Sequence, residues 1–159
     1  MEWKVGFDPV IDGNSKVLIL GSFPSVKSRE QGFYYGNKQN RFWKMLGNAL
    51  DKPVPESVEE RKNFLLDNKI ALWDVIEKCA ISGSSDADIT EANSVPVDFE
   101  KVLNQYDNIK LIICNGKKAY EVFLKFNKKN IVRCVLMPST SPANGRYDES
   151  VWIKTLRSI

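Results

Sequence analysis

The chain has 159 residues, of which 43% are hydrophobic and 27% charged, which is typical of one globular domain, here residues 1–159. Histidine is absent, which excludes an imidazole base and every histidine-ligated metal site, while the net charge of +3 is compatible with nucleic-acid binding. No apolar run reaches the roughly 18 residues of a membrane span, and the N-terminus carries no secretion signal, so we expect a cytoplasmic protein.

Apolar runs and helical stripes alternate along the chain. In chain order they predict a strand over Val17–Gly21, helices over Arg41–Leu50 and Ser57–Asn68, a strand over Ile70–Val75, a helix over Phe99–Tyr106, a strand over Leu111–Asn115, a helix over Lys117–Phe126, a strand over Arg133–Met137 and a helix over Val151–Arg157. The strands are apolar nearly throughout, as in a parallel sheet that is buried on both faces. This pattern predicts a three-layer α/β domain with a four-stranded parallel sheet.

Cysteine usage gives a further constraint. Cys79, Cys114 and Cys134 lie far apart and form no CxxC motif. Their odd number, without a secretion signal, predicts reduced and mostly buried thiols. An iron–sulfur cluster needs about four cysteine ligands, which argues against one here.

Ligands of open parallel sheets bind beyond the carboxyl ends of the strands, so the segments after each strand carry most of the functional information. The first of them places Phe23, Phe33, Tyr34 and Tyr35 in a loop that is otherwise polar. Such a loop suits a pocket in which a flipped base stacks on a ring. A satellite hydrophobic cluster beneath a long loop is the alternative.

Two further segments carry hydrogen-bonding groups. After the last strand, the hydroxyl groups of Ser139, Thr140 and Ser141 suit a phosphate, or else form an ordinary Ser/Pro/Asn turn. At the end of the third strand, Asn115 either points its amide into the cleft or shapes a tight turn with Gly116.

The motifs resemble a known family. GSFPSVKSREQGFYYGNKQNRFWK follows the first strand, and the last strand ends in MPSTSPAN. Over nearly the whole chain these motifs resemble the uracil-DNA glycosylase superfamily, in particular its hypoxanthine-DNA (deoxyinosine) glycosylase branch, family 6. NRFW is also similar to the mismatch-specific uracil/thymine branch. The resemblance implies a sheet order of 2-1-3-4.

The same resemblance implies a monofunctional base-excision-repair enzyme. It would hydrolyse the N-glycosidic bond of a flipped, deaminated base in DNA, most of all hypoxanthine and also uracil. A lyase would need a nucleophilic lysine, and nothing in the sequence indicates a buried lysine, so a lyase is not expected. The expected partner is DNA that contains a damaged base. We expect a monomer that needs no metal or cofactor and does not bind a membrane.

The chain departs from the superfamily's pattern at two catalytic positions. The first motif usually carries an Asp or Asn where this chain has Phe23, and the histidine of the second motif is replaced by Met137. In the hypoxanthine branch, asparagines are expected to carry the reaction instead, which implies Asn40 and Asn115 as catalytic residues. An asparagine amide matches the C=O and N–H edge of hypoxanthine and uracil alike, so pocket size must separate these two bases.

The remaining site predictions follow the motifs. The residues expected to bind the base are Gly21, Ser22, Phe23, Pro24, Tyr34 and Tyr35, with Tyr35 as the stacking ring. The residues expected on DNA phosphates, or as a wedge in the duplex, are Ser139, Thr140, Ser141, Asn144 and Arg146. Asp86 and Asp88 are lesser candidates for orienting the site, and Asp74 is predicted to be structural.

Three alternatives stay open at this point. One is a uracil/thymine mismatch glycosylase. Another is a catalytically inactive nucleic-acid-binding module on the same fold, suggested by the missing residue of the first motif. The last is a nucleoside hydrolase, against which the lack of histidine and of acidic metal-binding clusters weighs.

Overall fold

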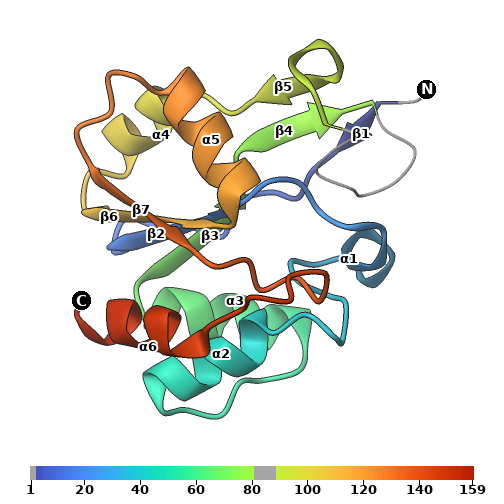
Figure 1. Ribbon diagram of the computed structural model, residues 1–159. Helices are drawn as coiled ribbons and strands as arrows, with labels where there is room; N and C mark the ends of the chain where they lie inside the picture. Colours follow the sequence, from blue (N-terminus) through green and yellow to red (C-terminus); the bar gives the residue numbers. More distant parts are fainter. Residues whose placement is uncertain (1–2, 81–88) are drawn as a thin grey trace.

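The computed structural model describes residues 3–80 and 89–159. At its centre is a four-stranded parallel sheet in the order β3-β2-β6-β7 (Figure 1). These strands are β3 (Ile70–Asp74), β2 (Val17–Gly21), β6 (Leu111–Asn115) and β7 (Arg133–Met137). Both the α/β class and the 2-1-3-4 order are thereby confirmed.

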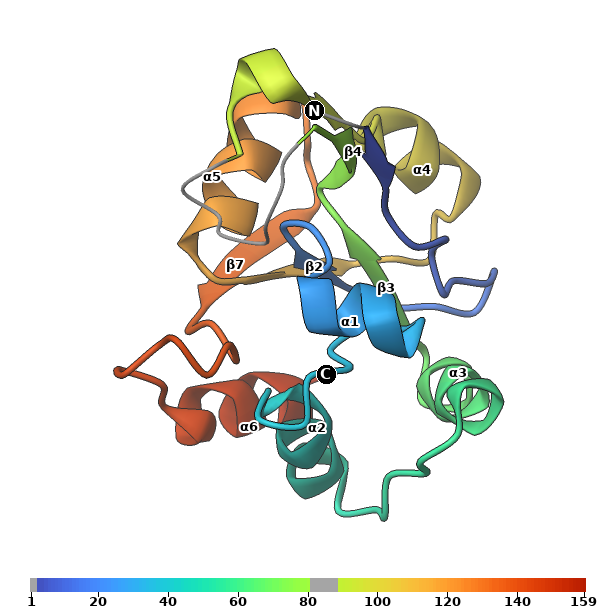
Figure 2. The same ribbon diagram turned by 90° about the vertical axis from the view of Figure 1, so that its right-hand side faces the viewer.

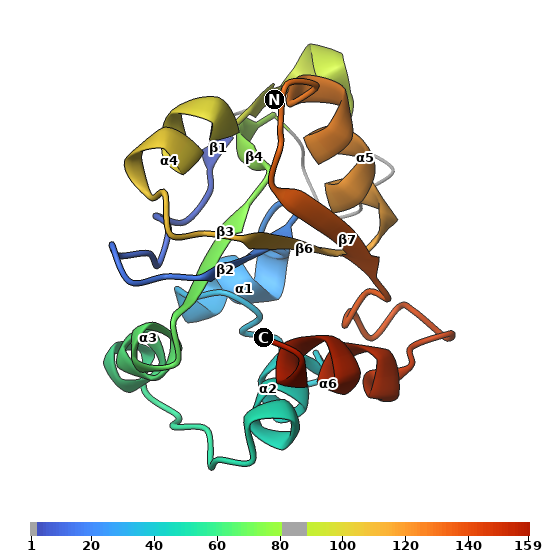
Figure 3. The ribbon, with the colours of Figure 1, turned by 90° about the vertical axis from the view of Figure 1, so that its left-hand side faces the viewer.

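Helices cover both faces of this sheet, giving the predicted three layers (Figures 2 and 3). On one face lie α2 (Phe42–Leu50), α3 (Val58–Asp67) and α6 (Glu149–Arg157). On the other lie α4 (Phe99–Gln105) and α5 (Lys117–Phe126). The ends of the predicted helices shift by one or two residues; α6, for instance, begins two residues early because Asp148 caps it.

The strand β2 shows why the sheet is apolar on both sides. Val17 and Ile19 pack into the core beneath α2, α3 and α6, while Leu18 and Leu20 pack into the core beneath α4 and α5. All four side chains are at most 1% exposed. Alternate residues of a strand point to opposite faces, so a continuous apolar run serves two cores.

Two features were not predicted. A short antiparallel sheet joins β1 (Lys4–Val5), β4 (Ile76–Cys79) and β5 (Ser94–Pro96), beside the 3-10 helix η2 (Glu91–Asn93). A six-residue helix, α1 (Val26–Gln31), interrupts the aromatic loop and is capped by Ser25. Within residues 3–80 and 89–159, no helix is long and apolar enough to cross a membrane.

Candidate active site

The loops after β2 and β7 meet at the carboxyl edge of the sheet, as predicted (Figures 1 and 2). Arg41 joins them through three contacts. Its backbone N–H donates to the carbonyl of Thr140 over 3.1 Å, and its Nη1 donates to the carbonyl of Asn144 over 3.0 Å. Its guanidinium also lies over the ring of Tyr147, 4.7 Å from the centroid. The start of α2 is therefore fastened to the 138–148 segment.

Asn115 ends β6 and reaches the same segment. Its Nδ2 donates to Oγ1 of Thr140, and its Oδ1 accepts from the backbone N–H of Thr140, each over 3.0 Å. Thr140 itself is completely buried. The turn that follows is tight: Gly116 has φ 96°, and a Cβ atom there would lie 3.1 Å from the Cβ of Ser139. The amide thus faces Thr140 in the 138–148 segment, while the turn is shaped by Gly116.

Asn40, the other predicted catalytic residue, is half-buried just before α2. Its Oδ1 accepts from the backbone N–H of Phe42, two residues further on, over 3.0 Å, as in an Asx turn; the N-cap of α2 is Arg41. No hydrogen bond from its Nδ2 group is found within the described part of the chain. Because Arg41 bonds to Thr140 and Thr140 bonds to Asn115, one buried residue connects the neighbourhoods of both asparagines.

The ends of β2 and β3 bring further groups to this edge. Gly21 pairs with Asp74, and a Cβ atom at Gly21 would lie 2.6 Å from Oδ1 of Asp74 and 3.0 Å from the hydroxyl oxygen of Tyr35. Only a glycine leaves room for both oxygens. Asp74 is 5% exposed, so a carboxylate is held inside the site region.

The two tyrosines of the aromatic loop differ in environment. The ring of Tyr35 is half-buried and stacks on Phe42 with the centroids 4.2 Å apart, and its φ of 53° is unusual for a residue other than glycine. Tyr34 is 2% exposed and donates its hydroxyl to the carbonyl of Asp8 over 2.8 Å. Burial, and then the nearby Asp74, raise the pKa of Tyr34 well above its ordinary value. Tyr34 is therefore placed as a core residue.

The first-motif residues lie mainly in the other core. Phe23 is 8% exposed, packs beneath α4 and α5, and has the guanidinium of Arg29 5.7 Å from its ring centroid. Pro24 is buried, and Ser22 is half-buried with its carbonyl accepting from the backbone N–H of Ile76 over 3.2 Å. Phe23 thus belongs to a different core cluster from the one that contains the tyrosines.

The 138–148 segment is held by its own polar groups. Ser139 Oγ accepts from the N–H of Ser141, and Ser141 Oγ accepts from Ala143, each over 3.2 Å. Asn144 donates its Nδ2 to the carbonyl of Ser139 and accepts from the N–H of Arg146. The side chain of Arg146 is exposed. Of the two predicted wedge residues, Arg146 has an exposed side chain, whereas the side chain of Asn144 is hydrogen-bonded within the segment.

The cysteines are reduced and mostly buried. All three cysteines are free thiols, with Cys79 and Cys114 buried and Cys134 half-buried, as predicted. The hydrogen bond with Cys134, together with burial, raises the pKa of Cys114.

Across residues 3–80 and 89–159, no three His, Cys, Asp or Glu side chains form a cluster suited to a metal ion. Asp86 and Asp88 lie outside the described residues.

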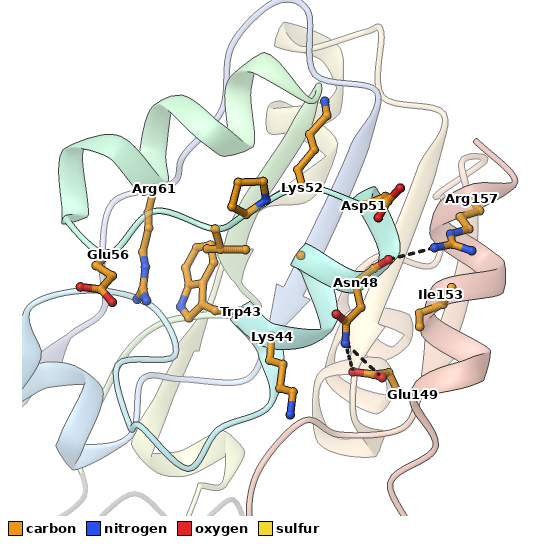
Figure 4. A pocket seen from close by; sticks show the side chains of 13 residues that line it. Trp43, Lys44, Asn48, Asp51, Lys52, Glu56, Arg61, Glu149, Ile153 and Arg157 are labelled. Atoms are coloured by element: carbon orange, nitrogen blue, oxygen red, sulfur yellow. Dashed lines mark hydrogen bonds between the residues drawn. The ribbon is translucent and has the colours of Figure 1, made fainter.

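A hollow of about 740 Å³ lies away from this region, between α2, α3 and α6 (Figure 4). Its wall carries charges of both signs, among them Lys44, Glu56, Arg61 and Glu149, beside Trp43. None of the predicted catalytic, base-binding or wedge residues lines it. Its size therefore does not make it the candidate active site.

Comparison with known proteins decides the family. The family model described as the uracil DNA glycosylase superfamily matches residues 9–156. The chain belongs to the uracil-DNA glycosylase superfamily. The membership that the motifs predicted is thereby confirmed.

Similar proteins include two from species of Methanosarcina. One, named hypoxanthine DNA glycosylase, from Methanosarcina acetivorans, is 36% identical over 97% of this chain and 98% of its own length. Another of the same name, from Methanosarcina barkeri, is 37% identical over 77% of this chain and 78% of its own length. The solution NMR structure of a candidate uracil DNA glycosylase from M. acetivorans has a TM-score of 0.84 and 34% identity, covering 99% of this chain and 98% of that one.

Sequence reasoning missed three features of the site. Arg41 appeared only as the start of a helix, Thr140 only as a phosphate ligand, and Asp74 only as a structural residue. Their partners lie far away in the chain, as in the 103 residues that separate Arg41 from Asn144. Only Asp74 gave a signal in the sequence, because it is a charged residue at the end of an otherwise apolar strand. Buried charges are rare, so a charge at such a position indicates a special role.

Proposed function

We propose that this protein is a monofunctional DNA glycosylase that removes deaminated bases from DNA, with hypoxanthine as its principal substrate and Asn40 and Asn115 as its catalytic residues. The family match and the names of both relatives support a glycosylase for deaminated bases. The observation that carries the proposal is the paired hydrogen bonding of Asn115 with Thr140 at the carboxyl edge of the sheet.

The orientation of Asn115 suits the edge of a deaminated base. A side-chain amide has two N–H donors and an oxygen that accepts two hydrogen bonds. The backbone N–H and the hydroxyl of Thr140 belong to one residue, so they occupy the edge of the amide where its oxygen and one N–H lie side by side, each over 3.0 Å. The second N–H of the amide points away from this edge and is left to donate to a ligand. The C=O of hypoxanthine can accept from it, whereas adenine presents an amino group at the same place, so a donor would face a donor.

The reaction is a hydrolysis at C1′ of the deoxyribose. The bond from C1′ to the base nitrogen breaks, and its electron pair leaves with the base. The oxygen of a water molecule bonds to C1′, and a water proton ends on the departing base. Asn115 stabilises the negative charge that develops on the base oxygen, because a positioned donor is most effective where charge develops. Asn40 orients the attacking water or the sugar face.

The surrounding residues hold the flipped nucleotide. Tyr35 stacks against the base, since its half-buried ring already has Phe42 behind one face. Ser139 and Ser141 contact the flanking phosphates, and Arg146 enters the gap left in the duplex. The enzyme acts as a monomer, in the cytoplasm, on DNA alone.

A release assay across four substrates tests this function. Oligonucleotides containing hypoxanthine, uracil, xanthine or thymine are incubated with the enzyme and then cleaved by alkali at abasic sites. The proposal expects hypoxanthine to be released fastest and uracil more slowly. Preferential release of thymine or uracil from mismatches would favour the mismatch-specific alternative. Binding to DNA without release of any base would favour the inactive module.

A further inference from the structure

Thr140 is buried beneath the surface of the 138–148 segment, away from the exposed positions that DNA could contact. Its side chain is completely buried, in a segment whose neighbours Ser141 and Pro142 are half-buried and exposed. Its hydroxyl oxygen and its backbone N–H both bond to the amide of Asn115, and its carbonyl accepts from Arg41. A hydroxyl with this burial and these partners is poorly placed to meet a phosphate.

These contacts favour one orientation of the Asn115 amide. A backbone N–H can only donate, so it must face Oδ1 of Asn115, as it does over 3.0 Å. If the amide turned over, its Nδ2 would face that N–H and two donors would oppose one another. The hydroxyl of Thr140 reinforces the choice, because it accepts from Nδ2 on the same edge of the amide.

We propose that Thr140 is a positioning residue, which holds the Asn115 amide in the orientation that matches a deaminated base. This inference rests on the proposed function, in which Asn115 contacts the base edge. The carbonyl of the same residue accepts from Arg41, the residue after Asn40, over 3.1 Å. Thr140 therefore also sets the spacing between the two catalytic asparagines.

The test compares two substitutions, each of which changes one group of the threonine side chain. Thr140→Val removes the acceptor for Nδ2 while keeping the shape and the backbone N–H, and Thr140→Ser keeps the hydroxyl. At saturating enzyme, we expect Val to slow single-turnover release of hypoxanthine by about 10- to 100-fold, and Ser to stay within about threefold of the parent. Affinity for the oligonucleotide should be nearly unchanged in both. Thr155→Val, the same substitution on α6, is the matched control.

A double variant separates positioning from an independent role. If Thr140 acts through Asn115, adding Thr140→Val to Asn115→Ala should slow release no further. Independent, multiplying losses would overturn the proposal. So would a Val variant that keeps its single-turnover rate but binds DNA more weakly and with less dependence on salt, because that is the behaviour of a phosphate contact.

Failure of this inference is distinguishable from failure of the proposed function. A normal rate for Asn115→Ala would remove Asn115 from the reaction. A slow Asn115→Ala beside a normal Thr140→Val would refute only the positioning role. If the Val variant does not fold, hydrogen exchange in the parent protein gives the answer. The side-chain amide protons of Asn115 should exchange more slowly than those of the exposed Asn14, and equal rates would contradict the proposal.

Discussion

The carboxylate of Asp74 fills the space in which a side chain at Gly21 would begin. A Cβ atom at Gly21 would lie 2.6 Å from Oδ1 of Asp74, closer than real contacts allow, and 3.0 Å from the hydroxyl oxygen of Tyr35. The glycine that ends β2 is therefore required by its neighbours. It lets a buried carboxylate and a tyrosine hydroxyl approach the carboxyl edge of the sheet together.

Gly21→Ala tests this packing directly. The added methyl must displace Asp74 or Tyr35, so we expect a loss of about 1–3 kcal/mol in the free energy of unfolding, as for overpacked cores. Excision of hypoxanthine should fall as well, because either displaced group lies beside the proposed base-binding residues. Denaturant titration and single-turnover assays measure the two effects. Gly13→Ala is the matched control, since a Cβ there meets nothing within 4 Å. Equal behaviour of the two variants would contradict this description.

Tyr35→Ala tests the stacking ring. Stacking on an aromatic side chain contributes roughly 1–3 kcal/mol per base, so release should slow by about one to two decades. Tyr35→Phe keeps the ring on Phe42 and should retain most of the rate. A folded Tyr35→Ala variant with the parental rate would remove Tyr35 from the site. Circular dichroism confirms that each variant is folded.

Arg146→Ala tests the wedge. Flipping a base out of a duplex costs a few kcal/mol, which an inserted side chain helps to offset. The loss should be larger on duplex than on single-stranded substrates containing hypoxanthine. Arg133→Ala, an equally exposed arginine at the other end of β7, controls for the loss of charge. Equal losses on duplex and single-stranded DNA would argue against insertion.

The fold was largely predictable because buried strands can be recognised from short runs of apolar residues. Val17–Gly21 is apolar throughout and lies between two cores, so its role followed from the pattern alone. The small sheet was missed because β1 has two residues and β5 three, too few for a recognisable alternation. Helix α1 was missed because its sequence, VKSREQ, has almost no apolar stripe.

The site was predictable only in part. The motifs indicated which loops meet, and Arg41 with Thr140 confirms that meeting. They could not say what each side chain touches, because the buried Thr140 and the half-buried Ser139 are both hydroxyl residues of one loop. The same limit applies to Tyr34 and Tyr35, adjacent residues of one type. Only their backbone geometry sends one into the core and leaves the other half-exposed.

Arg41→Lys tests the fastening of the 138–148 segment. Lysine keeps the charge but loses the planar contact with Tyr147 and the directed bond to Asn144. Backbone amides of the segment should exchange with solvent faster than in the parent protein. Excision should slow by about tenfold, because small displacements of positioning groups lower the rate of a reaction. Arg157→Lys, on α6 outside the site, is the control. Unchanged exchange in the segment would show that Arg41 does not hold it.

Single-turnover release of hypoxanthine by Asn40→Ala and Asn115→Ala tests the central claim most directly. Asn14→Ala serves as the control, and EDTA is present throughout. Asn40→Ala removes one local hydrogen bond, whereas Asn115→Ala removes the partner of two polar groups of the buried Thr140, each worth about 1–3 kcal/mol, so circular dichroism must first show that both variants are folded. Loss of a positioned transition-state contact should slow release by roughly 100-fold or more in one or both. If both release hypoxanthine at the parental rate, the asparagine mechanism is wrong, and Asp86 and Asp88 become the residues to test.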